Sequence, residues 1–155
     1  MNMTFRYPDQ FLTVRHNPGG ALLQSEVLGV EEDRSDRGED RPTPFTISIS
    51  ITHNKLIDAA KVDGLGDMFP DGTEASFAEE KDVAERVTVA GKPGYGLLMG
   101  SHGEFERVVY ATLDPIWTLA IRCDFVGEAA RPKVSVSDQM TACERVISTL
   151  AIDLG

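Results

Sequence analysis

The sequence predicts a mixed α/β domain of the α+β type, in which a C-terminal helix packs on a central antiparallel sheet. Three observations predict this class. Apolar and polar residues alternate along several short segments, which is typical of half-buried strands. Short turns join the later strands, which favours antiparallel pairing. Apolar residues then recur at spacings of three and four near the C-terminus, which is typical of an amphipathic helix.

The length and composition fit a single domain over residues 1–155 with a core of its own. The hydrophobic fraction of 41% is ordinary for a globular protein. The formal net charge of −10 disfavours nucleic acid and anionic lipid as partners, because both carry negative charge. No apolar run in the sequence is long enough to span a bilayer. We therefore expect a protein partner, no nucleic acid and no membrane insertion.

The first fifty residues are predicted to form strands. Three short segments are rich in aromatic, aliphatic and β-branched residues and are separated by turns at 8–9 and 17–20; they cover 4–8, 11–17 and 21–30. In the clearest strand, apolar residues alternate with small hydroxyl residues, namely Phe45, Ile47, Ile49 and Ile51 with Thr46, Ser48, Ser50 and Thr52. One face of this strand should lie on the core, and the hydroxyl face should meet solvent or another thin layer.

The second half of the chain is predicted to be a meander that follows an irregular middle. Residues 54–62 could form a short helix that begins at Asn54. Strand patterns then cover, in order, residues 84–91, 95–100, 104–113 and 116–126. In the last of these, alternate residues share an apolar face: Leu119, Ile121, Cys123 and Phe125.

The C-terminal helix is expected from about Ser137 to Leu150, with Ser137 as its N-cap. Asp138 follows the cap, where the helix dipole favours a negative charge. The apolar stripe of this helix consists of Met140, Cys143, Val146, Ile147 and Leu150. This stripe should pack on the meander and bury the apolar face of the last strand.

The two cysteines, Cys123 and Cys143, lie on the apolar faces of the last strand and the last helix. A zinc site is not indicated, because these residues are twenty positions apart with no histidine nearby. If the helix packs on the strand, the two side chains point into the same layer. They could then form a disulfide or remain two buried thiols, and the sequence leaves both alternatives open.

No catalytic motif and no cofactor-binding motif is recognisable. The three histidines, His16, His53 and His102, fall in no nucleophile or metal-binding pattern. The glycine-rich stretches at 91–96 and 100–103 are explained by turn formation. We therefore expect no catalytic residue, no cofactor and no enzymatic activity. A small enzyme with an unrecognised site is the third alternative, after the two binding functions described below.

Residues 63–82 carry seven acids and one base, and the segment 31–41 is a second acidic cluster. Calcium is one possible ligand, but the EF-hand spacing is absent and a solvated acidic loop is favoured. Such charges could also serve only solubility. A basic partner surface would suit them, because opposite charges speed association. The candidate partner-binding residues are Asp63, Asp67, Asp71, Glu74, Glu79 and Glu80.

The order of these elements resembles that of the Mog1/PsbP-like superfamily. The fragments that carry the resemblance are "GYGLLMGSHGEFERVVYATL", "WTLAIRCDF" and "SDQMTACERVISTLAI", after a strand-rich first half and an insertion rich in glycine and acids. The resemblance implies an α/β/α sandwich around a central antiparallel sheet. It covers most of the chain but includes no catalytic signature.

Within that superfamily, two fragments are similar to periplasmic immunity proteins that block a type VI secretion muramidase: "FRYPDQFLTVRHNPGGALLQSEVLG" and "IRCDF…ACERVISTL". This resemblance implies a bacterial, non-enzymatic inhibitor that binds a cognate toxin and occludes its substrate groove. Because "MNMTFRYPDQ" lacks the features of an export signal, we expect a periplasmic protein if a signal was removed and a cytoplasmic one otherwise. The alternative function is an assembly factor or secretion chaperone that binds a client protein.

Overall fold

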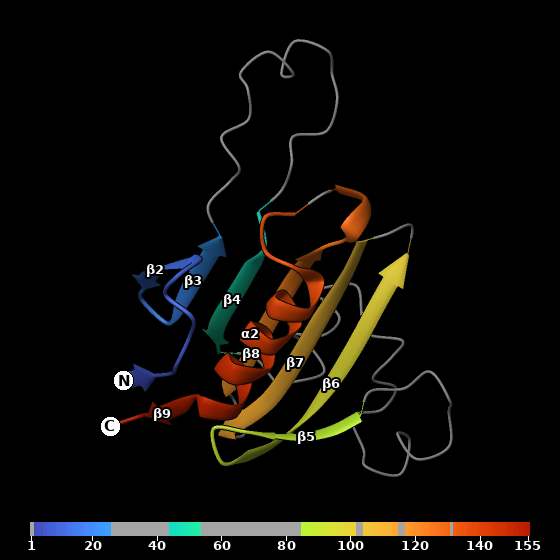
Figure 1. The fold of residues 1–155 in the computed structure, drawn as a ribbon. Coiled ribbons are helices and arrows are strands. Elements are labelled where there is room, and N and C mark those ends of the chain that lie inside the picture. The colour runs from blue at the N-terminus through green and yellow to red at the C-terminus, as the bar shows by residue number, and fades with distance from the viewer. Residues whose placement is uncertain (1, 26–43, 54–84, 102–103, 115–116, 131) are drawn as a thin grey trace.

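The computed structural model describes residues 2–25, 44–53, 85–101, 104–114, 117–130 and 132–155. Their elements, in chain order, are β1 (Asn2–Thr4), β2 (Leu12–Asn17), β3 (Gly20–Ser25), β4 (Thr46–Thr52), β5 (Glu85–Val89), β6 (Lys92–Ser101), β7 (Glu104–Asp114), β8 (Trp117–Val126), η4 (Glu128–Ala130), α2 (Val136–Thr149) and β9 (Ala151–Asp153). Figure 1 shows their arrangement. No helix among the described residues is both long and apolar enough to cross a bilayer.

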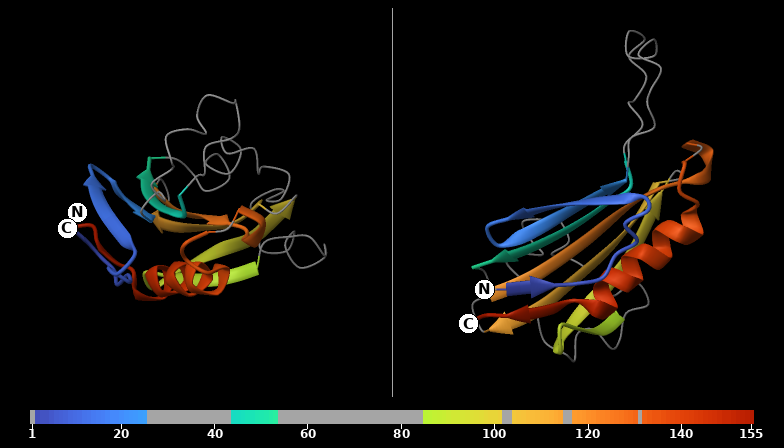
Figure 2. Two further views of the ribbon diagram at one scale, coloured as in Figure 1. Left: turned by 45° about the horizontal axis from the view of Figure 1, so that its top comes forward. Right: turned by 60° about the vertical axis from the view of Figure 1, so that its left-hand side comes forward.

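The main sheet has seven strands in the order β2-β3-β4-β8-β7-β6-β5, and all neighbouring strands are antiparallel. A second, two-stranded sheet pairs β1 with β9, so that Met3 lies opposite Ile152. Helix α2 lies on one face of the main sheet, over its middle strand β8 (Figures 1 and 2). The predicted fold class is therefore confirmed. A second helical layer, which an α/β/α sandwich would have, is not found within the described residues.

The core lies between α2 and the sheet. Period-two alternation points the apolar residues of β4 and β8 to the same face, because the register places Ile47 beside Cys123 and Ile49 beside Ile121. The predicted core residues are all buried, with 0–6% of each surface exposed: Leu119, Ile121, Val146, Ile147 and Leu150. The expected packing of the last helix on the last strand is therefore confirmed.

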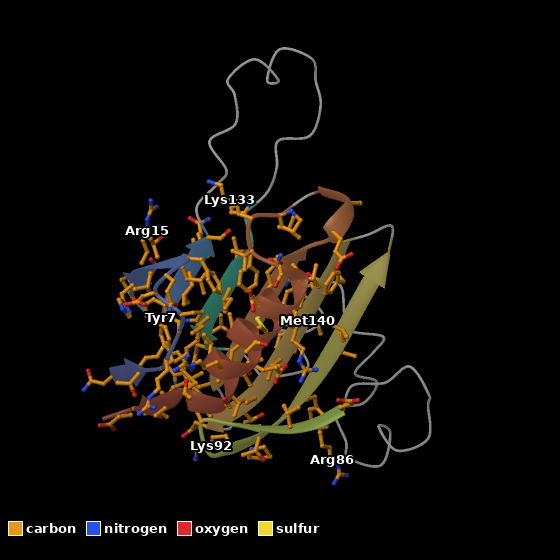
Figure 3. The ribbon with its side chains drawn as sticks, in the orientation of Figure 1. Tyr7, Arg15, Arg86, Lys92, Lys133 and Met140 are labelled. Carbon is orange, nitrogen blue, oxygen red and sulfur yellow. A yellow bond between two sulfur atoms is a disulfide. The ribbon has the colours of Figure 1, made fainter. Side chains whose placement is uncertain are left out.

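The helix begins earlier than predicted. Its N-cap is Ser135, whose Oγ accepts a hydrogen bond from the backbone N–H of Asp138 at 3.1 Å, whereas the prediction placed the cap at Ser137. Met140 was predicted to face inward, but it is 40% exposed and lies on α2 as labelled in Figure 3. The polar residue Gln139 takes the inward position instead, and its surface is 0% exposed. The inward stripe therefore begins at Gln139, one residue before the predicted Met140.

Gln139 can be buried because its side-chain amide forms hydrogen bonds with backbone groups at the end of β8 and just before α2. Its Oε1 accepts a hydrogen bond from the N–H of Val126 at 2.7 Å. Its Nε2 donates to the carbonyl oxygens of Val126 at 3.0 Å and Val134 at 2.9 Å. These bonds join the end of β8 to the start of α2, and an apolar side chain at this position could not make them.

Two strand boundaries also differ from the prediction. The turn expected over residues 91–96 is confined to Ala90 and Gly91, which both have positive φ, at 52° and 72°. This two-residue turn closes the β5–β6 hairpin, so that β6 begins already at Lys92. The first strand was predicted over residues 4–8, but it covers Asn2–Thr4, pairs with β9 outside the main sheet, and leaves residues 5–8 without strand structure. The predicted helix at 54–62 lies outside the described residues.

Candidate functional site

The six acidic residues predicted to contact a partner lie outside the described residues: Asp63, Asp67, Asp71, Glu74, Glu79 and Glu80. The second acidic segment, 31–41, lies outside them too. Their role in binding therefore stays a prediction. A calcium site at residues 63–74 is untested for the same reason.

The two described histidines each lie against an aromatic ring, and they belong to different parts of the chain. His16 belongs to β2 and lies against Phe5, with 6.1 Å between the ring centroids. His53 follows β4 and lies against Trp117, with 4.7 Å between the centroids. No group of three or more His, Cys, Asp or Glu side chains is placed to hold a metal ion within the part of the chain that the structure describes.

Cys123 and Cys143 form a disulfide that ties β8 to α2, with 6.1 Å between their Cα atoms. The sequence left open whether these residues form a disulfide or remain two buried thiols, and in the structure they form the disulfide. Both residues are 0% exposed, and they lie in the apolar layer between the helix and the sheet. A disulfide buried in this way is a structural link, because neither sulfur is accessible to a reductant in the folded protein.

The opposite face of the sheet carries a polar surface that we call the polar sheet face. It consists of Thr46, Ser48 and Ser50 of β4, Glu106 of β7, and Arg122 and Asp124 of β8. The antiparallel register brings these residues together: Ser48 lies opposite Arg122, and Asp124 lies between Thr46 and Glu106. Ser50 and Asp124 are exposed, and the other members of the face are half-buried. Helix α2 lies on the other face (Figure 2).

Among the described residues that define the polar sheet face, the acidic side chains outnumber the basic one. Glu106 and Asp124 are direct cross-strand neighbours, a placement that is unfavourable for two carboxylates. Arg122 compensates one of them, since its Nε lies 3.5 Å from Oε2 of Glu106. Asp124 accepts a 3.3 Å hydrogen bond at Oδ2 from the hydroxyl of Thr46. Among the six residues that define this face, two are acidic and one is basic, and the acidic residue that is not paired with Arg122 is Asp124.

The exposed part of this surface lies toward β4. On the side of β7, the residues that share the face, Val108 and Tyr110, are buried. Thr118, at the start of β8, is buried as well. The hydroxyl face predicted for β4 is therefore partly open to solvent, since Ser50 is exposed while Thr46 and Ser48 are half-buried.

A second ion pair lies on the helix side of the sheet. Nε of Arg107 is 3.3 Å from Oε1 of Glu144 on α2, but the geometry is not that of a hydrogen bond. The guanidinium lies against Gly96 of β6, where a Cβ atom would come within 2.9 Å of Nη1. Glycine thus leaves room for the arginine. Because Glu144 is well exposed, this pair is expected to add little to stability.

The sequence offered a signal for only part of the polar sheet face. The alternation in β4 indicated its hydroxyl residues, but the charged residues of β7 and β8 were not singled out. Asp124 and Thr46 are 78 residues apart in the chain, and only the strand order makes them neighbours. The exposed pair of His53 and Trp117 was missed for the same reason, because β4 and β8 meet through long-range pairing.

Comparison with known proteins gives few matches. No family model matches the chain, and no curated protein matches it. Among solved structures, the chain is similar to a protein of Bacteroides thetaiotaomicron, with 13% sequence identity and a TM-score of 0.46. The match covers 99% of this chain and 46% of that protein, so the chain spans less than half of that protein's length.

Proposed function

We propose that this chain is a non-enzymatic protein-binding domain, and that it acts as an immunity protein against a secreted antibacterial effector. The observation that carries the binding function is the polar sheet face, where hydroxyl groups and an incompletely balanced cluster of charges lie around the exposed residues Ser50 and Asp124. Surfaces of this kind recognise proteins by hydrogen bonds and charge complementarity. The narrower assignment rests on the two sequence fragments that resemble those of periplasmic immunity proteins.

The proposed target is a muramidase, and the proposed mode of inhibition is occlusion of its substrate groove. A muramidase cleaves glycan strands with carboxyl groups in a long cleft. An inhibitor that fills this cleft needs no catalytic group of its own, because steric exclusion of the glycan is sufficient. It needs a stable fold and a surface that complements the cleft.

Export to the periplasm is the second part of the proposal. The buried disulfide between Cys123 and Cys143 supports it, because disulfides persist in oxidising compartments and are rare in the reducing cytosol. A muramidase acts on peptidoglycan, which lies in the same compartment. The proposed inhibitor and its target would therefore meet where the toxin acts.

The alternative function is an assembly factor or secretion chaperone. It would use the same kind of surface, but it would bind a client that is not yet folded. The two functions differ in the state of the partner. An immunity protein forms a stoichiometric complex with one folded effector, whereas a chaperone releases its client once the client has folded.

Co-expression tests the proposal. The candidate effector, the product of the gene beside that of this chain, is directed to the periplasm with and without this protein. We expect cell lysis with the effector alone and survival when both are present. With purified proteins, hydrolysis of peptidoglycan should stop at a one-to-one ratio. If the effector remains fully active with an excess of folded, oxidised protein, the immunity function is wrong.

A further inference from the structure

We infer that the polar sheet face is a docking surface for a cationic segment of the partner protein, and that Asp124 receives an arginine or lysine side chain from that segment. This inference rests on the proposed function only in taking the partner to be a protein. It specifies which surface is used and which chemistry fits it.

The first step is the charge balance within the face. The carboxylates of Glu106 and Asp124 oppose each other across β7 and β8, and one of the six described residues that define the face, Arg122, is a cation. That cation lies beside Glu106. A second cation placed at Asp124 would complete an alternating arrangement of two negative and two positive charges. It would remove the unfavourable interaction between the two carboxylates.

The second step is the geometry of the acceptor. Asp124 is exposed at the middle strand of the sheet, and the hydroxyl of Thr46 donates to its Oδ2. Its Oδ1 can therefore accept from a donor that approaches from solvent. A guanidinium group matches a carboxylate well, because its planar N–H groups can contact both oxygens.

The third step concerns the surroundings of Asp124. Thr46, Ser48 and Ser50 form a row of short side chains along β4. Their hydroxyl groups can donate to and accept from the backbone of a docked segment. Their immobilisation also costs little conformational entropy, since they have few rotatable bonds. Arg122, opposite Ser48, can donate to a carbonyl oxygen of the same segment.

The fourth step is the charge of the whole protein. A net charge of −10 attracts a cationic segment over a distance and repels an anionic one. The net negative charge of the chain and the carboxylate of Asp124 therefore both favour a cationic segment at this surface. A nucleic acid would be repelled by both, and an anionic partner segment would meet like charge at this site.

The test uses the full-length oxidised protein and a short peptide of alternating arginine and glycine residues. Backbone amide signals are followed by NMR during titration at about 0.01 M and about 0.15 M ionic strength, where the Debye length is about 30 Å and about 8 Å. We expect the largest shifts at Thr46, Ser48 and Asp124. Asp124→Asn should weaken binding about two- to fivefold, as loss of an exposed ion pair does, and Asp124→Lys by at least about tenfold.

Asp153 supplies the matched control, because it is also an exposed aspartate but lies on β9 in the other sheet. Asp153→Asn and Asp153→Lys make the same changes in net charge and should reduce affinity less than the matching changes at Asp124. A peptide with glutamate in place of arginine should not bind. Equal losses in the two series, shifts confined to residues 63–82, or no binding to the wild-type protein would each overturn the inference.

The docking surface and the immunity function can fail separately. If Asp124→Lys still protects cells from the effector as well as the wild-type protein does, the surface assignment is wrong and the immunity function stands. If neither the wild type nor the variant protects, the immunity function is wrong, and the peptide titration still decides the docking surface.

Discussion

Removing the disulfide between Cys123 and Cys143 should lower the free energy of unfolding by about 3 kcal/mol. The bond closes a loop with a sequence separation of 20 residues. In the chain-entropy model, a loop of this size restricts the unfolded chain by an entropy that corresponds to about 3 kcal/mol at 25 °C. A typical domain has only about 5–15 kcal/mol of stability, so this is a large share of it.

The location of the bond affects this estimate. Both cysteines are fully buried between α2 and β8, so the double variant Cys123→Ala with Cys143→Ala also leaves a small cavity in the core. Replacing each sulfur by hydrogen removes favourable packing and adds to the entropic loss. Reduction of the wild-type bond leaves two buried thiols and no such cavity. The reduced wild type should therefore lie between the oxidised protein and the double variant in stability.

Urea unfolding followed by circular dichroism measures all three forms. A reducing agent should lower the denaturation midpoint of the wild type and leave that of the double variant unchanged. Mass measurement after alkylation of protein taken from the periplasm should find no free thiol. Equal midpoints for the oxidised wild type and the double variant would refute the stabilising role. Two alkylated thiols in the periplasmic protein would refute the presence of the bond.

Three further changes have distinct expected outcomes. Ile121→Ala should lower the free energy of unfolding by about 2–5 kcal/mol, because Ile121 is fully buried. Met140 is partly exposed, so Met140→Ala should change the free energy of unfolding by less than about 1 kcal/mol. Equal effects of the two substitutions in urea melts would contradict the helix packing. Gln139→Leu should cost about 2 kcal/mol in the same melts, because three partly buried backbone groups lose their hydrogen-bond partner. An unchanged midpoint would contradict this role. Replacing Asp67 and Asp71 with lysine should slow association with a cationic partner at low salt and have little effect at high salt. Stopped-flow mixing measures these rates, and unchanged rates at low salt would show that residues 63–82 are not part of the interface.

The sequence contained enough local information to predict the faces of β4 and β8. Their alternation has a period of two residues, which sets the direction of each side chain without reference to any other strand. The same pattern placed Cys123 in the core, and the spacing of three and four residues placed Cys143 there. The predicted contact between helix and strand followed, because two apolar faces in a small domain have to cover each other.

Other features depended on partners that no local pattern reveals. From the sequence alone, Gln139 is expected to face solvent, because its hydrogen-bond partners at the end of β8 are not evident. For this reason the inward stripe of α2 was predicted to begin one residue too late. The imbalance at Asp124 likewise depends on the register of β8 against both β4 and β7. Such registers join segments far apart in the sequence, so hydropathy alone does not specify them.

Strand β8 connects the stability of this protein to the proposed binding. Along three successive residues it points Arg122 to the polar sheet face, Cys123 to the core and Asp124 back to the polar sheet face. The disulfide therefore holds the strand that presents both charged groups. Because the sheet is hydrogen-bonded on both sides of β8, loss of the bond should reduce the fraction of folded protein without moving Asp124 within the folded state. Binding by the reduced protein should then fall in proportion to its folded fraction, with unchanged affinity per folded molecule.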